Sequence, residues 1–135
     1  MVLRMAVGAI FIAHGWQKLC DVPATIVAFE GLGVPAPEIG AYLAITTEFF
    51  GGIGLLLGAL TSVAALGPAI AMACAIYFVH GGSGLFLEND GWQYPLILLL
   101  VCLYLATNGA GAYSIDGLFT DQERRFRRRH RQVAT

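Results

Sequence analysis

Four apolar segments, separated by polar or glycine- and proline-rich connections, organise the chain. They cover about residues 1–19, 40–60, 63–79 and 92–108. A transmembrane helix needs about 20 predominantly apolar residues, so each segment predicts a membrane span, with the last the shortest. The pattern therefore predicts an all-α protein, a bundle of four transmembrane helices within residues 1–118.

The first apolar segment has two interpretations. A basic residue, Arg4, followed by a short apolar run is typical of a signal peptide, but no small-x-small cleavage site precedes His14 to Lys18. The alternative is a retained transmembrane helix. We favour the retained helix, because an even number of spans agrees with the charges on both sides.

The connections carry shorter signals. Ala24–Phe29 is a short apolar piece between polar residues, and it predicts a small helix lying on the membrane interface. Leu60–Ser62 predicts a tight turn between the second and third spans. Gly51 and Gly52 predict an exposed face that accepts either a second copy of the chain or a different subunit.

Composition supports the membrane assignment, and charge gives it an orientation. The chain is 57% hydrophobic and 13% charged, with a mean hydropathy of +0.69. Apart from Arg4 and Lys18, all basic residues are arginines between Arg124 and Arg131. Cytoplasmic segments carry an excess of Lys and Arg, so both termini are expected on the cytoplasmic side of the membrane.

The C-terminal residues 119–135 form the expected basic cytoplasmic tail. Thr120–Glu123 has the pattern of a capping box, which predicts a short surface helix. A basic segment beside a membrane span is expected to contact anionic lipid rather than nucleic acid.

The cysteines and cofactor motifs exclude several classes of protein. The three cysteines are too few and too scattered for a disulfide framework, and none has zinc-site spacing. No metal site is expected. The chain has no haem, iron–sulfur or flavin motif, so any redox centre must come from a partner or from a quinone.

Ionisable residues within the apolar segments are the candidate site. His14 and Lys18 stand four residues apart and share one helix face. With a rise of about 1.5 Å per residue, Glu48 in the second span lies between them in depth. Intramembrane ionisable residues are commonly functional, so His14, Lys18 and Glu48 are candidate catalytic residues, with a purely structural polar network as the alternative.

Aromatic and histidine residues extend this site. Phe11, Trp16, His80 and Trp92 are the candidate ligand-binding residues, with the aromatic rings as apolar walls and with His80 and Trp92 around the mouth of the same region. Against this, tryptophans near span ends are commonly interface anchors, and His80 is equally compatible with a solvated loop. At the cytoplasmic side, Arg4 and Asp116 lie at similar depth and predict a structural ion pair.

The order and spacing of these motifs resemble the DoxX family of small bacterial membrane proteins. The resemblance covers residues 1 to about 118 and rests on Arg4-x3-Gly8-x2-Phe11-x2-His14-Gly15-x2-Lys18, Glu48, Gly51-Gly52, His80, Gly91-Trp92-Gln93-Tyr94-Pro95-Leu96 and Gly109 to Asp116. It implies a four-helix membrane protein associated with redox, since the family is named after the small membrane subunit of a thiosulfate:quinone oxidoreductase. Relatives commonly carry Glu where this chain has Gln93, so any proton-handling role of that Glu is absent or moved here.

Three functions fit these observations. The first is a small membrane subunit of a redox-associated complex, with a quinone- or quinol-binding polar pocket in its outer half. The second is a non-catalytic membrane anchor or assembly subunit for a partner enzyme. A small transporter ranks lower, because no internal repeat or broken helix pair is visible. The expected partners are membrane lipid and either further copies of the chain or a larger membrane complex.

Overall fold

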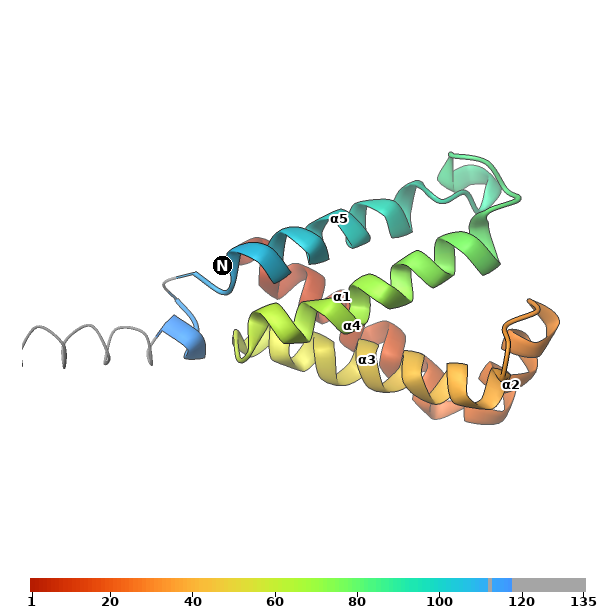
Figure 1. Cartoon of the computed structure of the whole chain (residues 1–135), viewed down its shortest axis with the longest axis horizontal. Helices are drawn as coiled ribbons and strands as arrows, with labels where there is room; N and C mark the ends of the chain where they lie inside the picture. The colour runs from red at the N-terminus through yellow and green to blue at the C-terminus, as the bar shows by residue number, and fades with distance from the viewer. Residues whose placement is uncertain (112, 118–135) are drawn as a thin grey trace, which may run out of the picture.

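The computed structural model describes residues 1–111 and 113–117, and this part of the chain contains helices and no strand. Its elements are α1 (Val2–Cys20), α2 (Val22–Gly31), α3 (Pro37–Leu57), α4 (Thr61–Ala75), the π-helical turn η1 (Ile76–His80), the 3₁₀ turn η2 (Leu87–Asn89) and α5 (Gln93–Asn108) (Figure 1). The all-α prediction is confirmed for these residues. The expected tail 119–135 and its helix at Thr120–Glu123 lie outside them.

Two helices of the described chain are long and apolar enough to cross a membrane. They are α3 and the continuous helix from Thr61 to His80, which joins α4 to η1. The first helix has 19 residues and α5 has 16, and both lie where apolar segments predict helices. The short piece Ala24–Phe29 also forms the expected helix, as part of α2.

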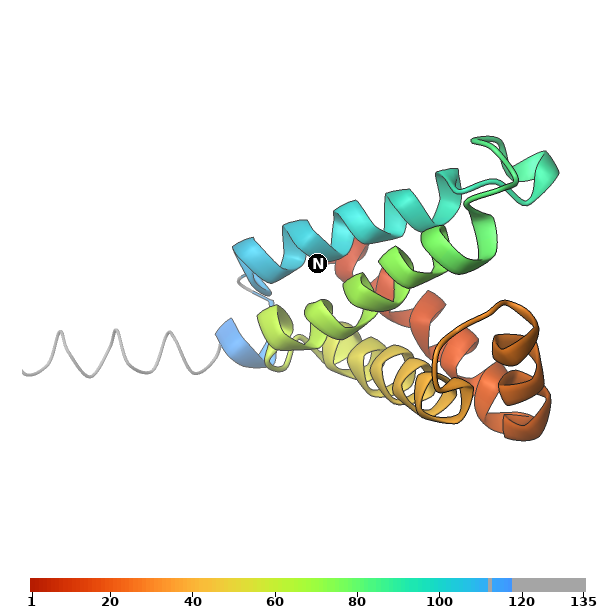
Figure 2. The same cartoon turned by 45° about the vertical axis from the view of Figure 1, so that its right-hand side comes forward.

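The helices form two antiparallel pairs that diverge toward one end. Helices α4 and α5 make one hairpin, while α1 packs along α3 (Figures 1 and 2). The pairs lie close together at the end with the α3–α4 turn, here called the turn end. At the other end, the α2 end, α2 folds back beside α1 and α3 (Figure 2).

Glycines bring α1 and α3 into backbone contact. A Cβ on Gly8 would lie 2.8 Å from the carbonyl oxygen of Gly52, and a Cβ on Gly15 would lie 2.6 Å from the backbone nitrogen of Phe49. No side chain larger than hydrogen fits at that separation without moving a helix. These contacts fix the register of α1 against α3 along their whole common length.

The prediction that Gly51 and Gly52 form an exposed face is wrong. A Cβ on Gly51 would lie 2.8 Å from the Pro68 side chain of α4, and a Cβ on Gly52 would lie 2.8 Å from the backbone of Gly8. Gly51 therefore serves the contact with α4, and Gly52 serves the contact with α1. Both glycines let neighbouring helices of the same chain approach closely.

The turn between α3 and α4 comes two residues earlier than expected. Gly58 ends α3 in the left-handed conformation, with φ of 68°, and α4 begins at Thr61. A left-handed glycine after the last helical residue is a common helix stop. The turn thus covers Gly58–Leu60 rather than Leu60–Ser62.

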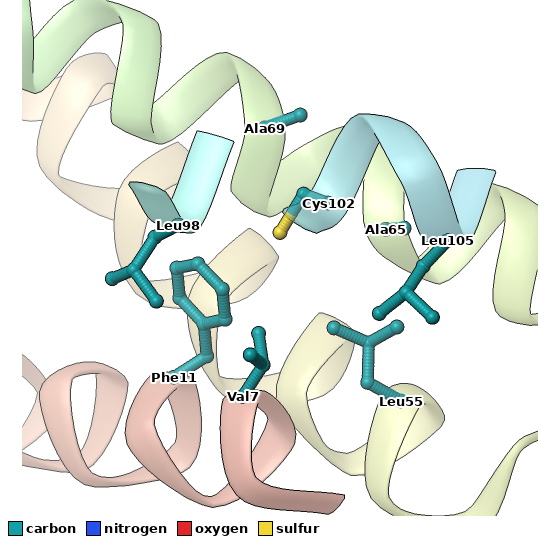
Figure 3. Close-up of a cluster of buried hydrophobic side chains, with 8 residues drawn as sticks. All are labelled: Val7, Phe11, Leu55, Ala65, Ala69, Leu98, Cys102 and Leu105. Atoms are coloured by element: carbon teal, nitrogen blue, oxygen red, sulfur yellow. The ribbon is translucent and has the colours of Figure 1, made fainter. Parts of the chain in front are cut away.

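One apolar core joins α1, α3, α4 and α5. It is formed by Val7, Phe11, Leu55, Ala65, Ala69, Leu98, Cys102 and Leu105 (Figure 3). The outward faces are also apolar, with large exposed side chains such as Phe50, Val63 and Leu100. An apolar exterior of this kind suits contact with lipid rather than water.

Candidate ligand site beside an ion pair

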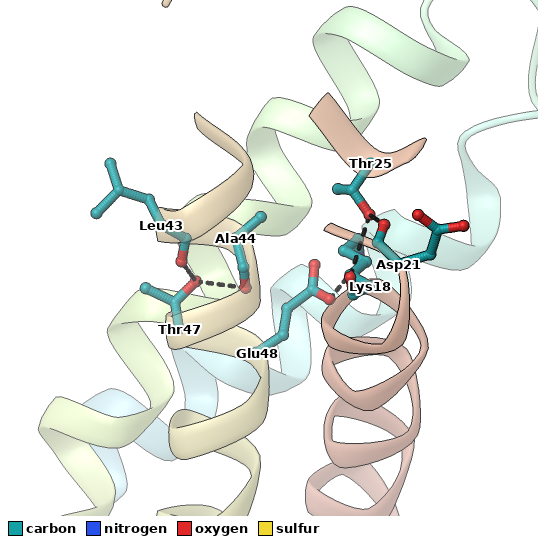
Figure 4. Close-up of polar contacts among 7 residues, drawn as sticks. All are labelled: Lys18, Asp21, Thr25, Leu43, Ala44, Thr47 and Glu48. Carbon is teal, nitrogen blue, oxygen red and sulfur yellow. Dashed lines mark hydrogen bonds and ion pairs between the residues drawn. The ribbon is translucent and has the colours of Figure 1, made fainter. Parts of the chain in front are cut away.

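An ion pair joins α1 to α3 near the α2 end. The Lys18 ammonium donates a hydrogen bond to Oε2 of Glu48 (Figure 4). The Glu48 side chain is 4% exposed and that of Lys18 is 26% exposed. The pair lies beside the Gly15–Phe49 contact, so the close approach of the two helices brings these charges together.

Local hydrogen bonds hold α2 against this pair. Asp21 precedes α2, and its carboxylate accepts a hydrogen bond from the backbone of Ala24 at 3.0 Å, which caps the helix. The Thr25 hydroxyl lies near two carbonyl oxygens, that of Asp21 at 2.9 Å and that of Lys18 at 3.3 Å (Figure 4). The cap and these contacts fold α2 back onto the end of α1.

Glu48 lines an apolar cavity of about 300 Å³ between α2, α3 and α4. Its walls are mainly aliphatic and aromatic side chains, including Phe29, Leu43, Ile70 and Phe78. The polar side chains on its wall are Glu48, Thr47 and Cys74. An apolar hollow with a few polar groups is typical of a small-molecule site.

Lys18 lines a second hollow, a polar groove of about 430 Å³ between α1 and α2. His14, Gln17, Asp21 and Thr25 also line this groove, which is more open than the cavity. The Lys18–Glu48 ion pair therefore lies between the two hollows, with the cation on the polar side and the carboxylate on the apolar side. Phe29 of α2 contributes to both walls.

Of the three predicted catalytic residues, the structure brings two into contact. Lys18 and Glu48 are in direct contact, whereas His14 is exposed and shares only the groove with Lys18. The described residues contain no group of three or more His, Cys, Asp or Glu side chains that could hold a metal ion.

The predicted ligand-binding residues are dispersed. Phe11 is fully buried in the core and lines neither hollow. Trp16 is 57% exposed and packs at a tilt against Phe49, with ring centroids 6.1 Å apart. His80 ends η1 and Trp92 directly precedes α5, and a ring nitrogen of His80 contacts the carbonyl oxygen of Asp90 in the connection between them. Neither His80 nor Trp92 lines the Glu48 cavity.

Arg4 occupies a separate site at the turn end. It is 3% exposed, and its guanidinium donates hydrogen bonds to the carbonyl oxygens of Ala110 at 2.7 Å and Tyr113 at 3.0 Å. Its Nε has no hydrogen-bond partner among the described residues. Arg4 therefore ties the segment after α5 to the start of α1.

Asp116 ties the same segment to the α3–α4 turn. Its carboxylate accepts hydrogen bonds from the backbone of Leu60 at 2.7 Å and of Thr61 at 2.9 Å. Burial alone would raise the pKa of Asp116, which lies after the last spanning segment. The hydrogen bonds from Thr61 and Leu60, with the charge of Arg4, outweigh burial and lower that pKa below its usual 3.8.

Sequence reasoning missed most of the cavity wall. Phe29, Thr47, Cys74 and Phe78 belong to three different helices, and no spacing in the sequence links them. Of these residues only Thr47 had a signal in the sequence, as a polar residue next to the intramembrane Glu48.

The fold and the Lys18–Glu48 ion pair define a small helical membrane protein with a polar site among its helices. Comparison with known proteins is more specific: residues 1–81 match the DoxX family, and the chain belongs to that family. It is a bacterial inner-membrane protein. No solved structure matches it.

Three relatives align with most of the chain. An uncharacterized protein of Haemophilus influenzae is 33% identical over 121 residues, 87% of each chain. The inner membrane protein YqjF of Escherichia coli is 32% identical over 118 residues, 87% of this chain and 89% of the relative. A Bacillus subtilis protein named "Putative oxidoreductase CatD" is 29% identical over 116 residues, 86% of this chain and 83% of the relative.

Proposed function

We propose that this chain is a quinone-binding membrane subunit of a redox complex, and that the Glu48 cavity is its binding site. The observation that carries the proposal is the ion pair between half-buried Lys18 and buried Glu48, whose carboxylate lies at the wall of an apolar cavity of about 300 Å³. An ionisable pair in a membrane interior is costly, and such residues usually mark ligand or proton pathways.

The two sides of the ion pair match the two needs of quinone chemistry. A quinone ring and its apolar tail need apolar walls, which Phe29, Ile70 and Phe78 provide. Quinone reduction also consumes protons and quinol oxidation releases them, so titratable groups must connect the ring to water. Lys18 and His14 line the polar groove on the other side and are suited to that connection.

The proposed topology has four spans, with both termini in the cytoplasm. Helices α1, α3, α4 with η1, and α5 would cross the membrane. The connections at the α2 end contain no Lys or Arg. They carry five acidic residues, Asp21, Glu30, Glu38, Glu88 and Asp90. The positive-inside tendency then directs that end outward, which places the cavity in the outer half of the bundle.

The electrons must come from or go to a partner. The sequence has no haem, iron–sulfur or flavin motif, so the chain supplies a quinone site and the partner supplies the other redox centre. The name of CatD supports an association with oxidoreductases. Purification of the intact complex would show whether it also contains further copies of the chain.

The cavity contains its own reporter for a binding test. Cys74 lines the cavity, whereas Cys20 is an exposed thiol outside it. The full chain is reconstituted in lipid nanodiscs under anaerobic conditions and titrated with decylubiquinol, whose fully substituted ring does not add thiols. The alkylation rate of each thiol by N-ethylmaleimide is then measured. We expect the ligand to slow alkylation of Cys74 and leave that of Cys20 unchanged.

A matched pair of variants shows whether Glu48 is responsible. Glu48→Gln should weaken the protection of Cys74, so that more decylubiquinol is needed to slow its alkylation. Glu38→Gln makes the same change at an exposed position in the first turn of α3 and should preserve the protection. Cys102 is fully buried, so its resistance to alkylation confirms that each variant is folded.

Unchanged Cys74 alkylation at saturating decylubiquinol would reject the quinone site. The alternative, a non-catalytic anchor, predicts that result together with a stoichiometric partner protein when the chain is purified from its native membrane.

A further inference from the structure

We infer that the Glu48 cavity selects the reduced, hydroxyl-bearing form of its ligand, the quinol, over the oxidised quinone. This inference rests on the proposed function, because it names which member of the quinone couple the same site prefers. It follows from which hydrogen-bonding groups face the cavity and which face the groove.

The carboxylate on the cavity wall is an acceptor. Glu48 forms an ion pair with the ammonium of Lys18, in which Lys18 donates a hydrogen bond to Oε2. An ionised carboxylate can only accept hydrogen bonds. Lys18 occupies Oε2, and the second oxygen, which has no hydrogen bond within the described chain, is turned away from Lys18 (Figure 4). That oxygen is the acceptor left for a ligand.

The neighbouring hydroxyl also offers no free proton. Thr47 donates its hydroxyl hydrogen to the carbonyl oxygen of Leu43 at 2.7 Å, with the carbonyl oxygen of Ala44 at 3.2 Å (Figure 4). A hydroxyl has one hydrogen, so only its lone pairs remain for a ligand. The third polar group on the wall, the Cys74 thiol, is a weak donor.

The strong donors near the site face the other way. Lys18 and His14 line the polar groove between α1 and α2, and neither lines the cavity. The ion pair therefore presents its cation to the groove and its acceptor to the cavity. A ligand in the cavity meets acceptors and no strong donor from the described residues.

This polarity distinguishes the two redox forms of a quinone. The quinone carries two carbonyl acceptors and leaves both without a strong donor on this wall. The quinol carries two hydroxyl donors, and one of them can donate to the free oxygen of Glu48. Hydrogen bonds to charged groups are among the stronger ones, so we expect the quinol to bind at least about tenfold more tightly.

Selective binding of the reduced form also changes the potential of the bound couple. Because the quinol is stabilised relative to the quinone, the bound couple is easier to reduce than the free couple. For a two-electron couple, a tenfold affinity ratio raises the midpoint potential by about 30 mV.

The test compares both forms on the same protein. Protection of Cys74 from N-ethylmaleimide gives the dissociation constants of decylubiquinol and decylubiquinone for wild-type protein in nanodiscs. Glu48→Gln is measured alongside, since an amide both donates and accepts and should therefore reduce the affinity ratio toward one. Glu38→Gln, at an exposed position of the same helix, should keep the wild-type ratio.

The outcomes separate this inference from the proposed function. A quinol preference of about tenfold or more in the wild type, lost in Glu48→Gln, supports it. Equal affinities, or tighter binding of decylubiquinone, would overturn the inference while leaving a quinone site in place. Binding of neither form would overturn both. The wild-type ratio decides the matter even where Glu48→Gln fails to fold.

Discussion

Replacing Gly15 by alanine tests the contact that brings the ion pair together. A Cβ at this position would lie 2.6 Å from the backbone nitrogen of Phe49 and 2.8 Å from its Cα. Ordinary contacts between such atoms begin near 3.4 Å. The added methyl group therefore acts as a wedge between α1 and α3, one turn from Lys18.

The expected loss of stability can be worked out from two opposing terms. Overpacking a close contact costs about 1–3 kcal/mol, and the upper end applies here because backbone atoms cannot rotate out of the way. Alanine stabilises a helix relative to glycine by about 1 kcal/mol, which offsets part of that cost. We therefore expect Gly15→Ala to lower the free energy of unfolding by about 2 kcal/mol, or the Tm by roughly 8 °C at about 4 °C per kcal/mol.

The buried thiol of Cys102 reports this change directly. Cys20 and Cys74 are exposed, whereas Cys102 is fully buried in the core (Figure 3). In a Cys20→Ser/Cys74→Ser background, a fluorogenic maleimide labels the chain only as the core opens. Thermal scans of this background with and without Gly15→Ala give the shift in Tm.

Gly31 provides the control. It is helical, at the end of α2, and a Cβ there would meet no atom within 4 Å. Gly31→Ala should leave the Tm unchanged or raise it slightly, since only the helix term remains. A Gly15→Ala protein as stable as the Gly31→Ala protein would refute the proposed wedge and the register of α1 against α3.

Three further predictions use the same thermal assay. Arg4→Lys should lower the free energy of unfolding by about 1.5–3 kcal/mol, because an ammonium lacks the planar fork that binds the carbonyls of Ala110 and Tyr113; Arg4→Lys with a wild-type Tm would argue against that tie. The ionised form of Asp116 stabilises the folded chain above pH 3.8 and this stabilisation is lost as the pH falls through its lowered pKa, so between about pH 5 and pH 3 the Tm of wild type should drop more than that of Asp116→Asn. Replacing the ion pair by Lys18→Met with Glu48→Leu should nearly preserve the Tm, since apolar residues often substitute for a buried pair without loss of stability, yet it should abolish quinol protection of Cys74; a large fall in Tm would assign the pair a structural role instead.

The helices were largely predictable from the sequence, but their contacts were not. Apolar segments show where each helix lies in the sequence, because a helix needs apolar side chains whether it is buried in lipid or in a protein core. The pair Gly51-Gly52 shows the limit. A small residue permits close approach of any helix, and nothing in the sequence says whether that helix belongs to the same chain or to another copy.

The sequence predicted the depth of the site residues in the membrane, but not the surroundings that each side chain meets. Counting residues from each span end placed Glu48 between His14 and Lys18 in depth, and Glu48 contacts Lys18. Arg4, Phe11 and Lys18 lie at intervals of seven residues along one stripe of α1, but the diverging helices give each a different environment. Arg4 binds the segment after α5, Phe11 enters the core, and Lys18 meets Glu48.

The cavity follows from the same divergence. Helices α3 and α4 are held together at the turn end by the Gly51–Pro68 contact and separate toward the α2 end (Figure 2). Helix α2 folds back there, and its Phe29 lines the cavity. No pattern along the chain encodes this space, because it depends on the angle between helices and on which side chains α2 brings to it.

The position of the ion pair lets the proposed site receive its ligand and its protons from different sides. Glu48 is almost inaccessible, and its burial in an apolar wall would be unfavourable for a lone carboxylate; Lys18 offsets that cost and is itself partly exposed toward a polar groove. A ligand dissolved in the bilayer would reach the carboxylate from the apolar side, while protons would reach its partner from the polar side. In the proposed function the two meet at Glu48, so the apolar wall excludes water from the ring without isolating the carboxylate from proton exchange.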